Sequence, residues 1–113
     1  MLLVWSASAS PTISRDHFQM VFPARALETT CNLLYTNLTG AQDAALFWGG
    51  AQAWSPTRGL VAKAPYDEEH VLRVTVDPAD AAEARRRRPT IRDTRDDVIR
   101  MMLDASPERD ARG

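Results

Sequence analysis

The stretch PARALETTCNLLYTNL, residues 23–38, carries the clearest periodic pattern of this 113-residue sequence. Its apolar side chains recur at spacings of four, three and four residues, which is one face of a helix with about 3.6 residues per turn. Pro23 suits the first helical turn, where its missing N–H is not needed, and Gly40 suits a helix stop. We predict an amphipathic helix over 23–38, with a buried face formed by Leu27, Cys31, Leu34 and Leu38.

Short apolar segments after this helix predict β-strands. Residues 44–48 read AALFW, with 51–54 as a continuation, and residues 60–64 read LVAKA. Between them, residues 55–59 (SPTRG) have the composition of a turn. Residues 70–76, HVLRVTV, alternate in the manner of a third strand. Together they predict a small antiparallel sheet.

Two helices are expected near the C-terminus. Asp77 can cap a helix that has Pro78 in its first turn and runs to about residue 88. Thr90 and Asp93 resemble a capping box, which predicts a last helix to about residue 105.

The fold class predicted from these segments is α+β, with a small antiparallel sheet packed on an amphipathic helix and two C-terminal helices. On the N-terminal side, residues 2–5 and 17–22 each have the pattern of a short strand. The length suits one domain. We divide the chain into a flexible leader or short edge strand (1–16), a single α+β domain (17–105) and a disordered tail (106–113).

Charge and cysteine content limit the partners and the compartment. The net charge is −1, so electrostatic binding would need a local patch. A single cysteine excludes an intramolecular disulfide and favours a cytoplasmic location. The first ten residues lack the long apolar run and basic start of a signal peptide, and no segment has the length of a membrane span. We expect no contact with a membrane.

No catalytic or metal-binding motif is recognisable in the sequence. His17 and His70 lack the spacing of metal ligands and are interpreted as surface or partly buried residues. Cys31 lies on the apolar face of the predicted helix, which favours core packing over a reactive thiol. The acidic residues 67–69 suit a solvated loop, with a cation site as the alternative, and Trp48 is interpreted as core. We predict no catalytic residue, no metal and no cofactor.

Two surfaces remain as candidate contact sites. The first is the arginine run 85–88, a candidate for nucleic-acid or anion contact, although arginine also suits a solvated helix end. The second is a candidate partner interface, consisting of an apolar stripe on the last predicted helix together with a tryptophan beside the glycine pair. The arginines are Arg85, Arg86, Arg87 and Arg88; the interface residues are Ile91, Val98, Ile99, Met102, Leu103 and Trp54.

Residues 18–78 resemble the N-terminal part of bacterial JAB/MPN-type (Mov34) domains. The resemblance rests on the order of its apolar segments, on a Trp-Gly pair and on a few flanking residues, namely Phe22-Pro23, Leu27 to Thr30, Thr39-Gly40, Leu46 to Gly49, Val61, Pro65 and Asp77. In that family a Glu, a His-x-His pair and a later Asp hold the zinc ion of an isopeptidase. Here the Glu position aligns with Asp43 and no His-x-His is present. The resemblance thus implies a truncated or degenerate relative without the zinc site.

The function predicted from the sequence is that of a small non-enzymatic interaction protein, which binds a protein partner or forms a homodimer through the C-terminal helix. The alternative is a nucleic-acid-binding or regulatory protein that uses the arginine run 85–88 weakly and without sequence preference. A JAB-type isopeptidase is the third hypothesis.

Overall fold

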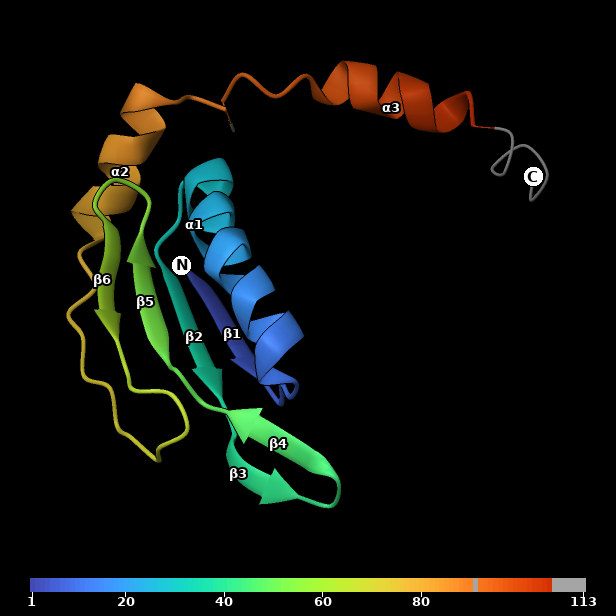
Figure 1. Cartoon of the computed structure of the whole chain (residues 1–113). Helices are drawn as coiled ribbons and strands as arrows, with labels where there is room; N and C mark the ends of the chain where they lie inside the picture. The colour runs from blue at the N-terminus through green and yellow to red at the C-terminus, as the bar shows by residue number, and fades with distance from the viewer. Residues whose placement is uncertain (91, 107–113) are drawn as a thin grey trace.

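A mixed four-stranded sheet in the order β1-β2-β5-β6 organises the molecule (Figure 1). The computed structural model describes residues 1–90 and 92–106. The first two strands of the sheet are parallel, and the remaining neighbours are antiparallel. A separate two-stranded hairpin, β3-β4, extends beyond one end of the sheet. In chain order the strands are β1 (Leu2–Ser6), β2 (Leu33–Asn37), β3 (Thr39–Gln42), β4 (Ala45–Trp48), β5 (Gln52–Ser55) and β6 (Gly59–Lys63).

The predicted helix over 23–38 is displaced in the structure. A π-helical turn, η1 (Pro11–Arg15), leads into α1 (Asp16–Thr29), so residues 17–22 are helical and not a strand. Thr30 adopts a left-handed conformation with φ of 54° and ends the helix. The segment that follows is β2, in which Leu33 and Tyr35 alternate as buried residues with a period of two.

The face that α1 buries also differs from the predicted one. Phe22 and Ala26 are buried, with Phe18 packed beside them, which gives spacings of four residues. Leu27 and Leu38 are instead exposed. The predicted spacing fitted a helix because it combined Leu27 of α1 with Leu34 of β2, while Cys31 and Leu38 lie outside both elements.

The antiparallel strands lie close to their predicted positions, although β4 belongs to the separate hairpin and β5 is a new strand of the four-stranded sheet and not its continuation. Residues 44–48 correspond to β4, and the turn over 55–59 joins β5 to β6. Residues 70–76 form no strand, because they belong to no ladder among the described residues. The α+β class is therefore confirmed, whereas the sheet is mixed and not purely antiparallel.

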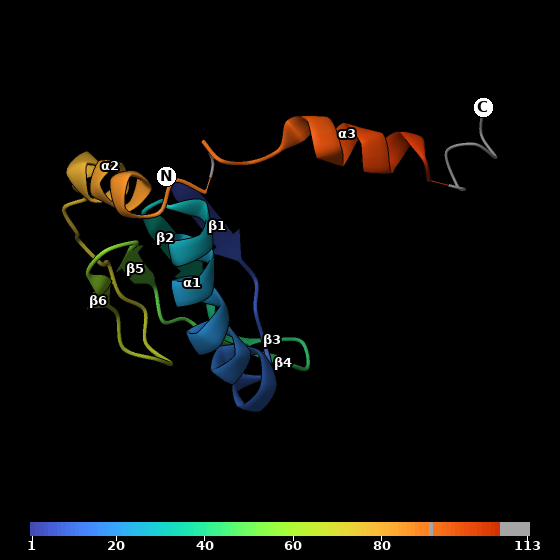
Figure 2. The ribbon, with the colours of Figure 1, turned by 90° about the horizontal axis from the view of Figure 1, so that it is seen from above.

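Two helices follow the sheet. α2 (Pro78–Arg87) begins as predicted, and its cap Asp77 accepts a hydrogen bond of 2.9 Å from the N–H of Ala79. α3 (Asp96–Asp104) begins later than predicted. The Asp93 N–H bonds to the Pro89 carbonyl at 2.8 Å, so Thr90 does not form the expected capping box. In Figures 1 and 2, α3 extends away from the sheet.

The core lies between α1 and one face of the sheet. Its buried residues are aromatic for the most part, and Trp48 is completely buried. The register puts Leu3 and Trp5 of β1 on the opposite face, where they are 52% and 75% exposed. No helix in the described part of the chain has the length and hydropathy needed to cross a bilayer. The buried core residues are Phe22, Ala26, Leu33, Tyr35 and Trp48.

Candidate functional site

The predicted arginine run is distributed over three environments at the end of α2. Arg85 donates a hydrogen bond of 3.3 Å to the hydroxyl of Thr30. Arg86 and Arg87 both pair with Glu83, Arg87 at 2.8 Å. Arg88 follows the helix, and its backbone N–H bonds to the Ala84 carbonyl. The four arginines therefore do not form one flat charged face.

The structure brings only some residues of the predicted partner interface together. Val98 and Ile99, together with Met102 and Leu103, lie on α3, none of whose described residues is buried. Trp54 lies in β5 and packs against the core, so it does not join them. Ile91 lies outside the described residues. Pairing of two chains through α3 stays a prediction.

The predicted core thiol and the two histidines do not contact one another through hydrogen bonds among the described residues. The Cys31 thiol donates to the carbonyl of Thr29 at 3.3 Å, and the Arg85 guanidinium lies 4.0 Å from its sulfur. No hydrogen bond joins His17 or His70 to this thiol in the part of the chain that the structure describes. Among those residues no three metal-binding side chains come together either.

A polar cluster at the carboxyl ends of β1 and β2 was missed by the sequence analysis. Asn37 accepts a hydrogen bond of 2.7 Å from the Ser8 N–H and donates one of 3.1 Å to the Ser8 carbonyl. The hydroxyls of Ser6 and Ser8 are hydrogen-bonded to each other. The indole of Trp48 donates to Ser14 at 3.2 Å. Ser8 and Asn37 are separated by 29 positions and meet because the parallel strands β1 and β2 end at the same edge of the sheet.

Tyr35 adds a buried hydroxyl to this cluster. Its side-chain oxygen has no hydrogen-bond partner among the described residues. Burial raises the pKa of Tyr35, and the nearby hydroxyls of Ser8 and Ser6 partly oppose that rise. A buried hydroxyl without a partner is unusual in proteins, because leaving a polar group unsatisfied costs about 1–3 kcal/mol.

Two glycines allow the chain to turn tightly beside the cluster. Gly49 and Gly50 have φ of 65° and 71°, and a Cβ on Gly50 would lie 2.6 Å from the ring of Tyr66. That ring packs edge-on against Trp48 and is covered by the Arg15 guanidinium at 4.6 Å. Gly50 therefore allows close packing against the aromatic core, whereas Gly49 allows a close approach to the side chain of Thr39.

An ion pair connects the β5–β6 turn to α2. Arg58 and Asp80 lie 2.7 Å apart, and Ser55 donates to the same carboxylate at 3.1 Å. The Arg58 hydrogen bond, assisted by that of Ser55, lowers the pKa of Asp80. This contact holds the turn against the start of the helix.

The chain belongs to the carbon–nitrogen hydrolase family, because the model of that family, described as carbon-nitrogen hydrolase, matches residues 2–86. Among curated proteins, the glutamine-dependent NAD(+) synthetase of Aquifex aeolicus is 38% identical over 88 residues. The fold resembles the carbon–nitrogen hydrolase of Helicobacter pylori, with a TM-score of 0.74 at 21% identity over 89% of this chain. It also resembles a cysteine-to-alanine mutant of a Nesterenkonia amidase from the nitrilase superfamily, with a TM-score of 0.58 at 26% identity over 80% of this chain.

The chain is much shorter than these relatives. It spans 15% of the Aquifex protein, and it covers 40% and 34% of the two solved chains.

These matches overturn two interpretations of the sequence. The resemblance to JAB/MPN domains is wrong, because apolar segments and a Trp-Gly pair are common to many α+β folds, whereas the hydrolase model matches 2–86 as a whole. The prediction of a non-enzymatic interaction protein, with its nucleic-acid-binding or regulatory alternative, is wrong as well, since the family is one of hydrolases. The second error arose because the sequence contains no recognisable catalytic motif.

Proposed function

We propose that this chain takes part in the hydrolysis of a carbon–nitrogen bond in a carboxamide, with the side-chain amide of glutamine as the preferred substrate class. The observation that carries the proposal is the family match over 2–86, which extends from β1 to the last turn of α2. The name of the Aquifex relative supports glutamine, and that of the Nesterenkonia protein supports an amide.

The proposed substrate region is the polar cluster at the carboxyl ends of β1 and β2. Ligands of sheets with parallel strands commonly bind at such ends. Asn37 fixes the main chain of Ser8 there by two hydrogen bonds, and the buried Tyr35 hydroxyl lies close to the hydroxyls of Ser8 and Ser6. The role of these residues is to shape and orient the site.

The nucleophile and its base are proposed to come from outside this chain. Amide hydrolysis needs an activated nucleophile and a proton donor for the leaving amine. In residues 1–90 and 92–106, neither histidine bonds to Cys31 or to a serine. The sheet face opposite α1 exposes Leu3 and Trp5, and we propose that the remainder of a hydrolase domain packs there.

The cytoplasm is the proposed location, supported by the single cysteine.

A chimera tests the proposal directly. The 88-residue segment of the Aquifex synthetase that aligns with this chain is replaced by the matching residues of this chain. We expect the chimera to release ammonia from glutamine, whereas this chain alone releases none. The matched control carries Asn37→Leu within the chimera, which removes both contacts to Ser8 and should lower the rate of ammonia release.

A chimera with a cooperative unfolding transition but without ammonia release from glutamine or from a panel of simple carboxamides would contradict the proposal. Release from simple amides but not from glutamine would retain the reaction and reject the substrate class.

A further inference from the structure

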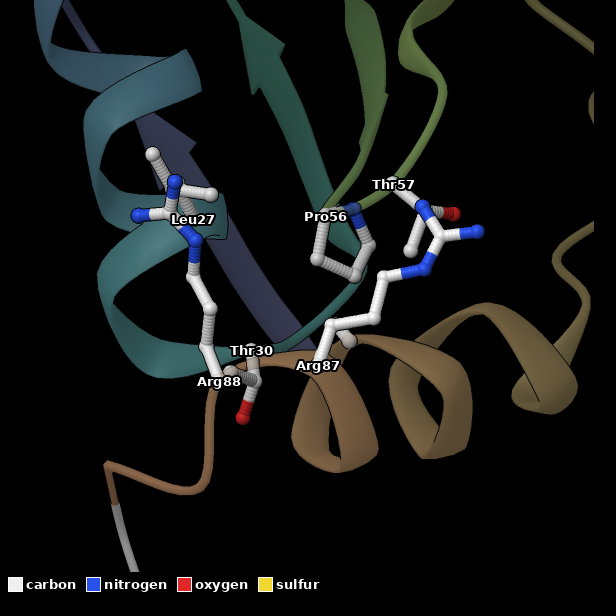
Figure 3. Close-up of a pocket in the computed structure, with 7 residues that line it drawn as sticks. Leu27, Thr30, Pro56, Thr57, Arg87 and Arg88 are labelled. Carbon is white, nitrogen blue, oxygen red and sulfur yellow. The ribbon is translucent and has the colours of Figure 1, made fainter.

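A second site is formed where α2 meets the end of α1 and the β5–β6 turn. A cavity of about 260 Å³ lies there. Figure 3 shows the side chains of Arg87 and Arg88 extending on either side of Pro56, toward Thr57 and Leu27 respectively. Two sides of the cavity are therefore formed by cationic side chains, and the other sides by apolar side chains and threonine hydroxyls. The lining residues include Leu27, Thr30, Pro56, Thr57, Arg87 and Arg88.

The positive charge at this cavity is only partly balanced by the described side chains. Glu83 is the carboxylate that pairs with the arginine run, and Arg86 and Arg87 share it. Within residues 1–90 and 92–106, no hydrogen bond or ion pair engages the Arg88 guanidinium. Because Arg87 uses its Nε for Glu83, its terminal nitrogens can still donate to a ligand.

These arginines are not needed as caps for the helix ends. At the end of α1, the N–H groups of Thr30 and Cys31 already bond to the carbonyls of the last turn. At the end of α2, the backbone N–H of Arg88 performs the same function. The Arg88 side chain and the terminal nitrogens of Arg87 therefore remain available, although the C-terminal ends of helices often attract such residues.

We infer that this cavity binds the phosphate group of a small phosphate monoester, independently of the proposed amide hydrolysis. Arginine prefers phosphate because its planar guanidinium donates two parallel hydrogen bonds to two oxygens. Arg88 supplies a guanidinium without an ion-pair partner among the described residues, and Arg87, which shares Glu83 with Arg86, supplies the donors of its terminal nitrogens. The organic part of the ligand rests on Leu27 and Pro56, and Thr57 lies beside the phosphate. The hydroxyl of Thr30 is already engaged by Arg85 and the Thr29 carbonyl.

The test is a titration of the full chain with inorganic phosphate and with phenyl phosphate at low ionic strength. Backbone amide resonances of Thr30, Thr57 and Arg88 report on binding. We expect saturable shifts for both probes, with phenyl phosphate bound more tightly because its ring reaches the apolar wall. The double variant Arg87→Gln, Arg88→Gln should weaken binding at least about tenfold, since hydrogen bonds to a charged group contribute strongly to the binding free energy.

Arg86→Gln is the matched control. Arg86 lies on the same helix, carries the same charge and shares Glu83, but it does not line the cavity. We expect its affinity for both probes to stay within about twofold of the parent protein, since exposed charges off the site act weakly. Absence of saturable shifts overturns the inference. Equal weakening by Arg86→Gln would also overturn it, because the effect would then depend on the net charge of the helix and not on the cavity. So would unchanged binding by the double variant, provided that its unfolding midpoint equals that of the parent protein.

Discussion

Replacing Trp48 by alanine should remove a large part of the stability of this fold. Trp48 is fully buried, and its ring lies 5.7 Å from Tyr35 and 5.9 Å from both Phe18 and Tyr66. Its indole also donates a hydrogen bond to Ser14. Truncation of a buried aromatic residue to alanine costs about 3–5 kcal/mol. We expect the upper half of that range, because three ring contacts and one hydrogen bond are lost together.

The assay is urea denaturation followed by far-ultraviolet circular dichroism, which gives the free energy of unfolding. Since small domains are stable by about 5–15 kcal/mol, Trp48→Ala can leave too little folded protein to measure. Trp48→Phe then serves as a second variant, with an expected loss of about 1–3 kcal/mol. Trp5→Ala is the matched control, because Trp5 is 75% exposed, and it should change the stability by less than about 0.5 kcal/mol. A loss below about 1 kcal/mol for Trp48→Ala, or equal losses for both tryptophans, would refute the description of the core.

Three further perturbations test other parts of the structure. The carboxylate of Asp80 has a lowered pKa, so its stabilising contribution is present above the ordinary value of 3.8 and is lost as pH falls below that value. Asp80→Asn should therefore flatten the acid limb of a curve of unfolding free energy against pH. An unchanged curve would argue against the ion pair. Gly50→Ala should destabilise more than Gly59→Ala in thermal unfolding, because both have positive φ but only at Gly50 would a Cβ meet the Tyr66 ring; equal midpoints would contradict this. Deletion of residues 90–113 should leave the unfolding midpoint unchanged, since α3 buries no described residue, and light scattering on both forms shows whether α3 pairs two chains.

Local chemistry in the sequence predicted the elements whose contacts are also local. The β5–β6 hairpin follows from its turn residues, and α2 follows from its Asp77 cap. The boundary between α1 and β2 could not be found in this way, because Leu33 and Leu34 suit either period. Tertiary packing decides it, since Leu33 lies between α1 and the sheet neighbours of β2.

The candidate site was less accessible to sequence reasoning than the fold. Ser8 and Asn37 are separated by 29 positions and become neighbours only through the parallel pairing of β1 with β2. A composition of serine and asparagine suggests a loop and nothing more specific. Similarly, the run 85–88 was visible as charge, but its division between Thr30, Glu83 and the cavity depends on how α2 packs.

The placement of β1 at the edge of the sheet has a kinetic consequence. Its strand partner β2 is reached only through α1, so that Leu2 pairs with Leu33, whereas Ser55 pairs with Gly59 across a tight turn. Closing the longer loop costs more chain entropy and slows the pairing. We expect the β5–β6 hairpin to fold before β1 pairs with β2. We also expect the amides of β1 to show the weakest protection from hydrogen exchange in the sheet. The parallel pair is then the last part of the sheet to form and the first to open, and the polar cluster at its end exists only while it is closed.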